Sequence, residues 1–397
     1  IQTTDLNTYA IYTDDSINIQ NLQDSVVTME VISLENEVVP IEVVQISRPV
    51  KTGRQIAKPI RYDLVVLLIN YADDRSTPYS INQVTNTILN DSNNESIAGF
   101  MKVSSYGRSS LKGDVFGWYS SSFNKGKICE IGGQTLILNE IMSQADNEID
   151  FSKYNHLMIV SSSNTGCPSS ASGFPKTYNT NDGQVKLSIG QISSASLLGL
   201  GTDLHEFGHQ IGLLHANGLE CGSLTIGGNC QSINYRDSFE TMGYTYGKGD
   251  FNSFNKEKLG WLINREIRNV VSPGIFTLTP LETPSGIKML KIPAGNLVYS
   301  IEYRRPNTIN KKTSELFGTN IFDGAIVHSN LKNLNLGYDS QLLDNSPHAS
   351  DTSFQDFADS SLKLNQKFQD PANNIEIKVL ALSESNLTVC INQIGYC

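Results

Sequence analysis

The chain lacks long apolar runs, an excess of positive charge and repetitive tracts. Its longest continuous apolar stretch, residues 64–69, is far shorter than the roughly 20 residues of a membrane-spanning helix. We therefore expect no membrane span. The net charge of −10 over 397 residues argues against nucleic acid or an anionic membrane as the main partner. Charged residues make up 18% and hydrophobic residues 39%, which is typical of a folded protein and not of a disordered one.

Cysteine is scarce and even in number. The six cysteines form no C-x-x-C pair, which argues against metal clusters and thioredoxin chemistry. We predict two short disulfide loops, Cys221 with Cys230 and Cys390 with Cys397. Cys129 is then left for Cys167, although the sequence alone allows other pairings. Disulfides form in oxidising compartments, so the cysteines predict a secreted, extracellular protein. The chain opens at residue 1 without a signal-peptide pattern, and we expect a processed form.

The length predicts more than one domain, because single hydrophobic cores rarely grow beyond about 250–300 residues. Short alternating runs predict a small β-rich segment over residues 1–55. Residues 56–270 mix buried strands with amphipathic helices, which predicts a second domain. Short strands broken by turn residues predict a β-sandwich-like C-terminal domain over residues 271–397. The expected fold class is α+β.

Apolar patterns place individual elements in the middle region. Continuous apolar residues predict buried strands at 64–69 and 156–160. Apolar spacing predicts helices at 80–89, 136–149 and 196–214. Residues 184–192 alternate like an edge strand, and such a strand can bind an extended peptide through main-chain hydrogen bonds.

An eleven-residue segment that starts at His205 holds three of the six histidines in the pattern H-E-x-x-H-x-x-G-x-x-H. His205 and His209 are four positions apart, so on a helix both would face one ion. Glu206 would stand beside that ion, where a general base is needed. On a continuing helix His215 would lie about 9 Å further along the axis, too far to share the ion. Gly212 allows the chain to leave the helix before His215 is reached.

Three neutral imidazoles leave a fourth position open for water, which is typical of a catalytic and not a structural zinc site. The alternative is that the histidines pack on a helix by accident, and a chance match of the whole pattern is far less expected. The sequence therefore predicts one Zn²⁺ ion held by His205, His209 and His215.

The pattern resembles the zinc signature of the metzincin metallopeptidases. Met242 follows within residues 235–243, a run similar to the Met-turn that lies beneath the metal in metzincins. That run, together with residues 215–217 and 254–261, resembles the gametolysin-like peptidase family. Residues 301–304 are similar to a segment of the immune-inhibitor-A-like secreted peptidases. The resemblance covers roughly residues 60–265 well and the C-terminal domain loosely.

The resemblance implies a metzincin-like catalytic domain, a twisted mixed sheet with an active-site helix. It implies that His205, His209 and His215 bind zinc and that Glu206 takes a proton from the attacking water. Tyr244 stands two residues after the methionine. Astacin-like and serralysin-like metzincins carry there a tyrosine that touches the metal or the reacting carbonyl.

We therefore expect a secreted, monomeric zinc endopeptidase that cleaves extracellular, cell-wall or matrix proteins. The alternative is a weak or inactive metzincin scaffold that binds a cell-surface or matrix partner. The complete set of ligands with its glutamate favours the enzyme. Asp237 either hydrogen-bonds around the Met-turn or is a surface acid. Ca²⁺ is a second candidate cofactor, with Asp73 and Asp74 or Asp339 as ligands, although no EF-hand spacing is present.

Overall fold

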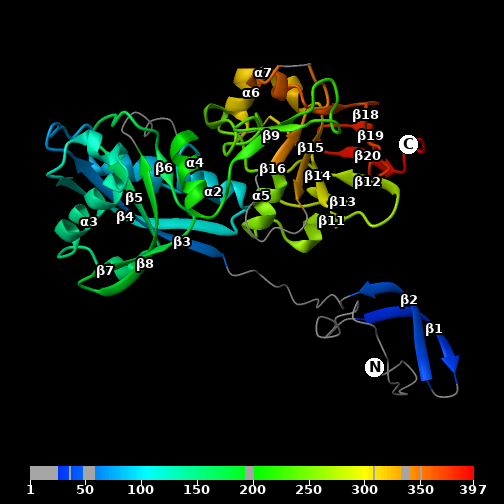
Figure 1. Ribbon diagram of the computed structural model, residues 1–397, viewed down its shortest axis with the longest axis horizontal. Helices are drawn as coiled ribbons and strands as arrows, with labels where there is room; N and C mark the ends of the chain where they lie inside the picture. Colours follow the sequence, from blue (N-terminus) through cyan, green and yellow to red (C-terminus); the bar gives the residue numbers. More distant parts are fainter. Residues whose placement is uncertain are drawn as a thin grey trace. The chain divides into compact units, whose positions relative to one another are not determined.

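The computed structural model describes residues 26–34, 37–47, 59–192, 201–306, 309–331, 340–348 and 351–397. They belong to two compact units, Ile1–Ala57 and Lys58–Cys397. In the first unit, β1 (Val26–Leu34) and β2 (Glu37–Ser47) form an antiparallel hairpin, drawn in blue in Figure 1. Among the described helices, none has both the length and the apolar character of a membrane span.

A mixed sheet forms the first half of the second unit, with the order β4-β3-β5-β8-β6. Strands β4, β3, β5 and β8 run parallel, whereas β6 and β7 pair antiparallel with β8. The strands are β3 (Ile60–Asn70), β4 (Ser109–Ser120), β5 (His156–Ser161), β6 (Ser170–Ala171), β7 (Lys176–Thr180) and β8 (Gly183–Ile192).

The two buried strands predicted at 64–69 and 156–160 are confirmed as parts of β3 and β5. The prediction of an edge strand at 184–192 is wrong. Strand β8 pairs with β5 on one side and with β6 and β7 on the other, and from residue 187 onward its side chains are buried. The alternation at its start comes from the outer part of the β7–β8 hairpin. Strand β6 stands at the end of the sheet instead.

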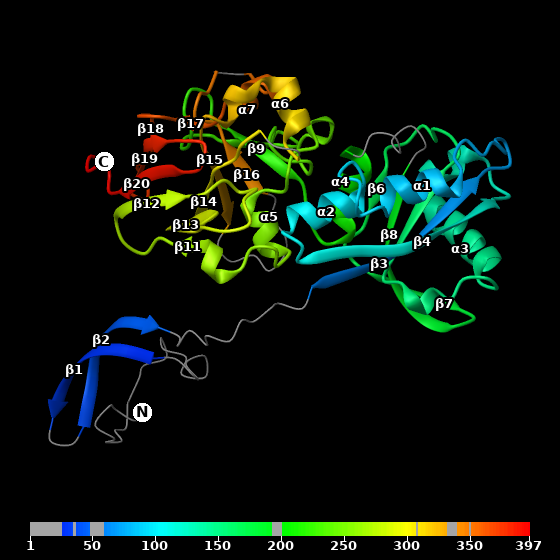
Figure 2. The same ribbon diagram turned by 180° about the vertical axis from the view of Figure 1, so that it is seen from behind.

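Helices cover both faces of this sheet (Figures 1 and 2). Successive side chains of a strand point to opposite faces. Leu64, Val66 and Leu68 of β3 share a core with α1, α2 and α4, whereas Val65 and its alternate neighbours share one with α3. The helices are α1 (Ile81–Ile88), α2 (Ile97–Ser104), α3 (Gly133–Ala145) and α4 (Gly201–Gln210), with short 3-10 turns η2 (Lys125–Cys129) and η3 (Phe151–Lys153).

Helices α1, α3 and α4 lie where the sequence predicted helices, with different ends, whereas α2 was not predicted. Ser80 caps α1 in a capping box with Gln83, so this helix begins where the sequence indicated. Helix α3 begins and ends a few residues earlier than predicted. Of the predicted helix at 196–214, residues 196–200 lie outside the described part, and α4 ends at Gln210 and not at 214.

Two further sheets form the second half of this unit. The larger has the order β10-β9-β16-β15-β14-β13-β11, with β17 also pairing with β15, and the smaller has the order β12-β20-β19-β18. Leu290 and Val327 from the larger sheet share one core with Ile377 and Val389 from the smaller. The two sheets therefore face each other as in a β-sandwich.

The elements of this half are β9 (Ala216–Glu220), β10 (Gln231–Ile233), η4 (Thr245–Gly247), α5 (Ser253–Lys258), η5 (Asn264–Glu266), β11 (Ile267–Asn269), β12 (Gly274–Leu278), β13 (Met289–Ala294), β14 (Leu297–Glu302), α6 (Lys311–Phe317), η6 (Thr319–Phe322), β15 (Gly324–Leu331), β16 (Ser340–Leu343), α7 (Phe354–Ala358), β17 (Leu362–Lys363), β18 (Lys367–Asp370), β19 (Ile375–Leu382) and β20 (Leu387–Asn392).

The boundary predicted near residue 270 does not separate the sheets. Strands β9 and β10 precede that residue, yet both belong to the larger C-terminal sheet. Strand β9 pairs in parallel with β16, with Ala216 opposite Ser340. The chain immediately after the predicted zinc motif is thus a strand of the C-terminal sheet.

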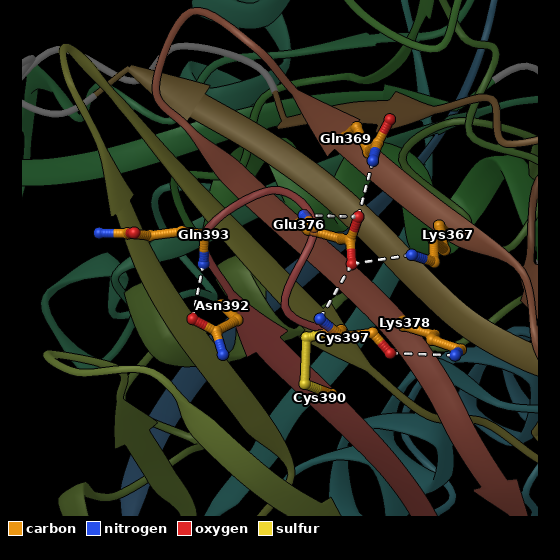
Figure 3. The surroundings of a disulfide bond; sticks show 9 residues. Lys367, Gln369, Glu376, Lys378, Cys390, Asn392, Gln393 and Cys397 are labelled. Atoms are coloured by element: carbon orange, nitrogen blue, oxygen red, sulfur yellow. Dashed lines mark hydrogen bonds and ion pairs between the residues drawn. A yellow bond between two sulfur atoms is a disulfide. The ribbon is translucent and has the colours of Figure 1, made fainter.

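The three predicted disulfides are confirmed: Cys129–Cys167, Cys221–Cys230 and Cys390–Cys397. Figure 3 shows the last of them, which ties the end of the chain to β20. There the buried carboxylate of Glu376 accepts hydrogen bonds from the Cys397 backbone N–H at 3.2 Å and from Lys367 at 3.1 Å. Lys378 donates to the Cys397 carbonyl at 3.0 Å, so side chains of β19 hold this residue at both its N–H and its C=O.

Candidate metal centre

The three histidines of the motif converge on one point. One ring nitrogen from each of His205, His209 and His215 lies within 4.8 Å of the others. The Nε2 atoms of His205 and His209, both on α4, are 3.1 Å apart. Two nitrogens that bind one zinc ion tetrahedrally at about 2.0–2.1 Å would be about 3.3 Å apart. The spacing therefore fits a shared metal ion.

The other nitrogens of these rings are already used. His205 Nδ1 lies 2.9 Å from the carbonyl oxygen of Thr241, and His209 Nδ1 lies 2.9 Å from that of Leu213. A carbonyl only accepts, so both Nδ1 atoms carry the proton and both Nε2 atoms present a lone pair. Two lone pairs facing each other repel unless a cation lies between them. This donor set fits a divalent metal.

The protonation state also suits metal binding. Burial, together with the nearby ring of His209, lowers the pKa of His205 to about 4 and that of His215 to about 4. Imidazole binds metals in its neutral form. Near neutral pH His205 and His215 can therefore take up an ion without first losing protons.

The turn predicted at Gly212 delivers the third histidine. Gly212 has φ of +95°, and its N–H bonds to the His209 carbonyl at 2.9 Å. The N–H of Leu213 bonds to the Gly208 carbonyl at 2.9 Å, which completes a Schellman-type end to α4. The chain then reverses and enters β9 directly after His215.

Met242 packs against α4, the helix that carries His205 and His209. It is fully buried, and a Cβ atom added to Gly208 of α4 would stand only 2.4 Å from its Sδ. Its carbonyl accepts the N–H of Ala216 at 3.1 Å. Asp237, earlier in the same turn, is also fully buried and lies 2.8 Å from His328, so it is not a surface acid.

Glu206 is buried beside the histidines, with 6% of its surface exposed, and its Oε2 has no hydrogen-bond partner. Burial raises the pKa of Glu206 to about 8. A divalent cation nearby would favour the carboxylate and lower that pKa. An unpaired buried carboxylate next to a metal is chemically able to accept a proton from water.

The structure does not bring Tyr244 together with the histidines. Its ring packs against Phe354, Phe317 and Tyr246, with centroids 4.2, 5.4 and 5.8 Å away. The tyrosine in ring contact with the site is Tyr235, which sequence reasoning did not assign to it. Its position at the start of the run that ends in the Met-turn was the available signal.

A second metal site does not appear among the described residues, where the three histidines are the only group of three or more histidine, cysteine or acidic side chains placed to hold an ion. Asp73 accepts the N–H of Lys125 and Asp74 accepts that of Ser76. Asp339, the other predicted calcium ligand, lies outside the described residues.

A cavity of about 220 Å³ adjoins His215. Its lining includes Phe254 and Glu257 of α5 and, from the larger C-terminal sheet, Asn330 and Ser340. The surface next to the third histidine is therefore built jointly by the region of the histidine motif and the C-terminal sheet.

Comparison with known proteins adds no relative to this picture. No protein-family model matches the chain, and no curated protein matches it. Function is therefore inferred from the residues of the site.

Proposed function

We propose that this protein is a zinc-dependent endopeptidase of the metzincin type. The observation that carries the proposal is the convergence of His205, His209 and His215, with proton-free Nε2 atoms on the first two, beside the unpaired carboxylate of Glu206. Three neutral imidazoles and an adjacent general base form the minimal set for hydrolysis by an activated water.

In this proposal the three histidines hold the ion, which would supply Lewis-acid polarisation of the scissile carbonyl and a more acidic water. Glu206 takes the proton of the attacking water and delivers it to the leaving amine. Its burial keeps bulk water from competing for its free oxygen. Tyr235, which lies against His215, is the tyrosine best placed to support the reacting carbonyl.

The substrate backbone would extend along β6, the terminal strand of the mixed sheet, and not along β8 as the sequence suggested. A Cβ atom added to Gly173, two residues after β6, would stand 2.6 Å from the His209 carbonyl oxygen, so this edge adjoins the metal centre. An edge strand offers unpaired main-chain groups to an extended peptide. Phe174, which is 75% exposed, would contact a substrate side chain.

Three disulfides favour an extracellular setting, and we propose secretion and a protein or peptide substrate. The second candidate, a binding protein on an inactive scaffold, has no observation of its own in its favour. It predicts tight binding of a partner without cleavage.

The test combines metal analysis with cleavage of casein and of a peptide library. We expect about one zinc per chain, cleavage that a chelator stops, and recovery when zinc is returned. Glu206→Ala and the nearly isosteric Glu206→Gln should both keep the metal and lose cleavage. Full activity in either variant, or a folded, zinc-loaded wild type that cleaves nothing in the library, would overturn the proposal.

A further inference from the structure

Buried polar side chains from the larger C-terminal sheet and the residues that follow its strands hold the segment that carries Met242. Residues 237–244 are called the Met-turn segment below. Arg304 follows β14 and His328 lies in β15, and both side chains are fully buried. Arg304 Nη1 donates to the carbonyl of Phe239, and His328 Nε2 lies 2.8 Å from Asp237 Oδ2. Arg304 and His328 therefore hold the beginning of the Met-turn segment at two points, Phe239 and Asp237.

Arg304 is itself fixed in one orientation. Its Nε donates to Glu302 Oε1 at 2.6 Å, and Nη1 also donates to the Asp250 carbonyl at 2.8 Å. The other oxygen of Glu302 accepts the N–H of Ser253 at 2.6 Å. Isolating such a pair from water costs several kcal/mol per ion, so a buried ion pair is a weak source of stability. A role in fixing geometry accounts better for its presence.

The Met-turn segment connects these two contacts to the imidazole ring of His205. Phe239, held by Arg304, is two residues before Thr241, whose carbonyl accepts the Nδ1 proton of His205 at 2.9 Å. Between them, Glu240 accepts the N–H of Asn252 at 2.6 Å. Each of the residues 239–241 is therefore held by a hydrogen bond. The bond between Thr241 and His205 sets both the tautomer and the orientation of that imidazole.

We propose that Arg304 and His328 are positioning residues of the metal centre. By fixing the Met-turn segment they hold the Thr241 carbonyl against His205 and so aim its Nε2 at the ion. The C-terminal sheet is then part of the metal centre, although none of its residues contributes a ligand. This inference rests on the proposed function in that it takes the three histidines to be a metal site.

Four variants test the proposal: Arg304→Met, Arg304→Lys, His328→Phe and His328→Gln. The matched control is Arg108→Met, because Arg108 is also mostly buried but pairs with Glu266 and the Trp261 carbonyl. Three measurements are made on each full-length protein. They are thermal unfolding without metal, zinc affinity by competition with a chelator, and the visible absorption spectrum after cobalt substitution.

We expect Arg304→Met and His328→Phe to weaken zinc binding about 10- to 100-fold, as loss of a ligand's supporting partner commonly does. Their cobalt spectra should change in band position or intensity. His328→Gln keeps a donor toward Asp237, and Arg304→Lys keeps the charge, so both should lose less affinity. The control should lose thermal stability and bind zinc like the wild type.

Equal zinc affinity and unchanged cobalt spectra in Arg304→Met, His328→Phe and the control would overturn the inference. If Arg304→Met does not fold, the zinc affinities and cobalt spectra of His328→Phe and His328→Gln are compared. Values equal to the wild type in both variants would then overturn the inference. A wild type that binds no zinc would instead refute the proposed function, so the two failures are distinguishable.

Discussion

The ring of Tyr235 lies against the ring of His215, with centroids 4.1 Å apart and planes inclined by 44°. The backbone of Tyr235 has φ of +62°, a left-handed conformation that non-glycine residues rarely adopt. Its N–H is held by the side chain of Asn217 at 3.0 Å. This local geometry turns Tyr235 toward the third histidine, whereas Tyr244 joins a separate aromatic group.

The first prediction separates these two tyrosines. We expect Tyr235→Phe to lower kcat by about 10- to 100-fold, because it removes a hydroxyl donor near the reacting carbonyl. Zinc content should not change. Tyr244→Phe is the matched control and should cleave like the wild type. The reverse result would restore the assignment of Tyr244 made from the sequence.

The second prediction concerns the turn at Gly212. A side chain at φ of +95° is strained, and we expect Gly212→Ala to lower the free energy of unfolding by about 1–2 kcal/mol. It should also weaken zinc binding about tenfold or more, because the turn delivers His215. Gly183, with φ of +101° in the β7–β8 turn, provides the control. Gly183→Ala should show similar destabilisation in urea and normal zinc affinity; an equal loss of zinc affinity in both would contradict this role.

The third prediction is a pH dependence of stability that comes from His156. This residue is 7% exposed between Tyr62 and Phe207, and its Nδ1 has no partner. Burial lowers its pKa from 6.5 to about 4. The folded state thus resists protonation, so this stability is complete above the unfolded pKa and is lost as pH falls from about 6.5 toward about 4.

Comparison of the wild type with His156→Phe isolates this contribution, since other histidines remain in both proteins. Between pH about 7.5 and about 5, the wild type should lose about 2 kcal/mol more unfolding free energy than the variant. Urea unfolding at the two pH values measures it. Parallel losses in the two proteins would show that His156 is not the source.

The fourth prediction orders two disulfides by the loops they close. The Cys129–Cys167 bond spans 38 residues and the Cys390–Cys397 bond spans 7. The chain-entropy model gives about 4 kcal/mol for the longer loop and about 2 kcal/mol for the shorter. Replacing each pair by alanine and measuring urea unfolding should therefore show the larger loss for Cys129–Cys167. A larger loss for the C-terminal pair would mean that its contacts around Glu376 outweigh loop length.

Features that depend on nearby residues could be predicted from the sequence. Continuous apolar residues indicate the buried strand at 64–69. The capping residue Ser80 and the apolar spacing that follows it indicate α1. The convergence of the three histidines was predictable because the spacing within the motif itself encodes the helix, its end at Gly212 and the return of His215.

Features that depend on distant pairing could not be predicted in this way. Nothing near His205 indicates that its Nδ1 will meet the carbonyl of Thr241. Arg304 looks like any surface cation in the sequence, yet it is fully buried, because Glu302 and two carbonyls converge on it from separate segments. The status of β8 likewise depended on β6 and β7 folding back to cover it.

The parallel pairing of β9 with β16 has a practical consequence for engineering. Ala216, the residue after the last histidine of the motif, lies opposite Ser340. The half of the protein that carries the histidines therefore needs the C-terminal half to complete its structure, and we expect that it cannot be expressed alone or fused to a new module. Any chimera that exchanges the C-terminal half must supply a strand that pairs with Ala216 in place of β16. Without such a strand, the position of His215 is no longer fixed.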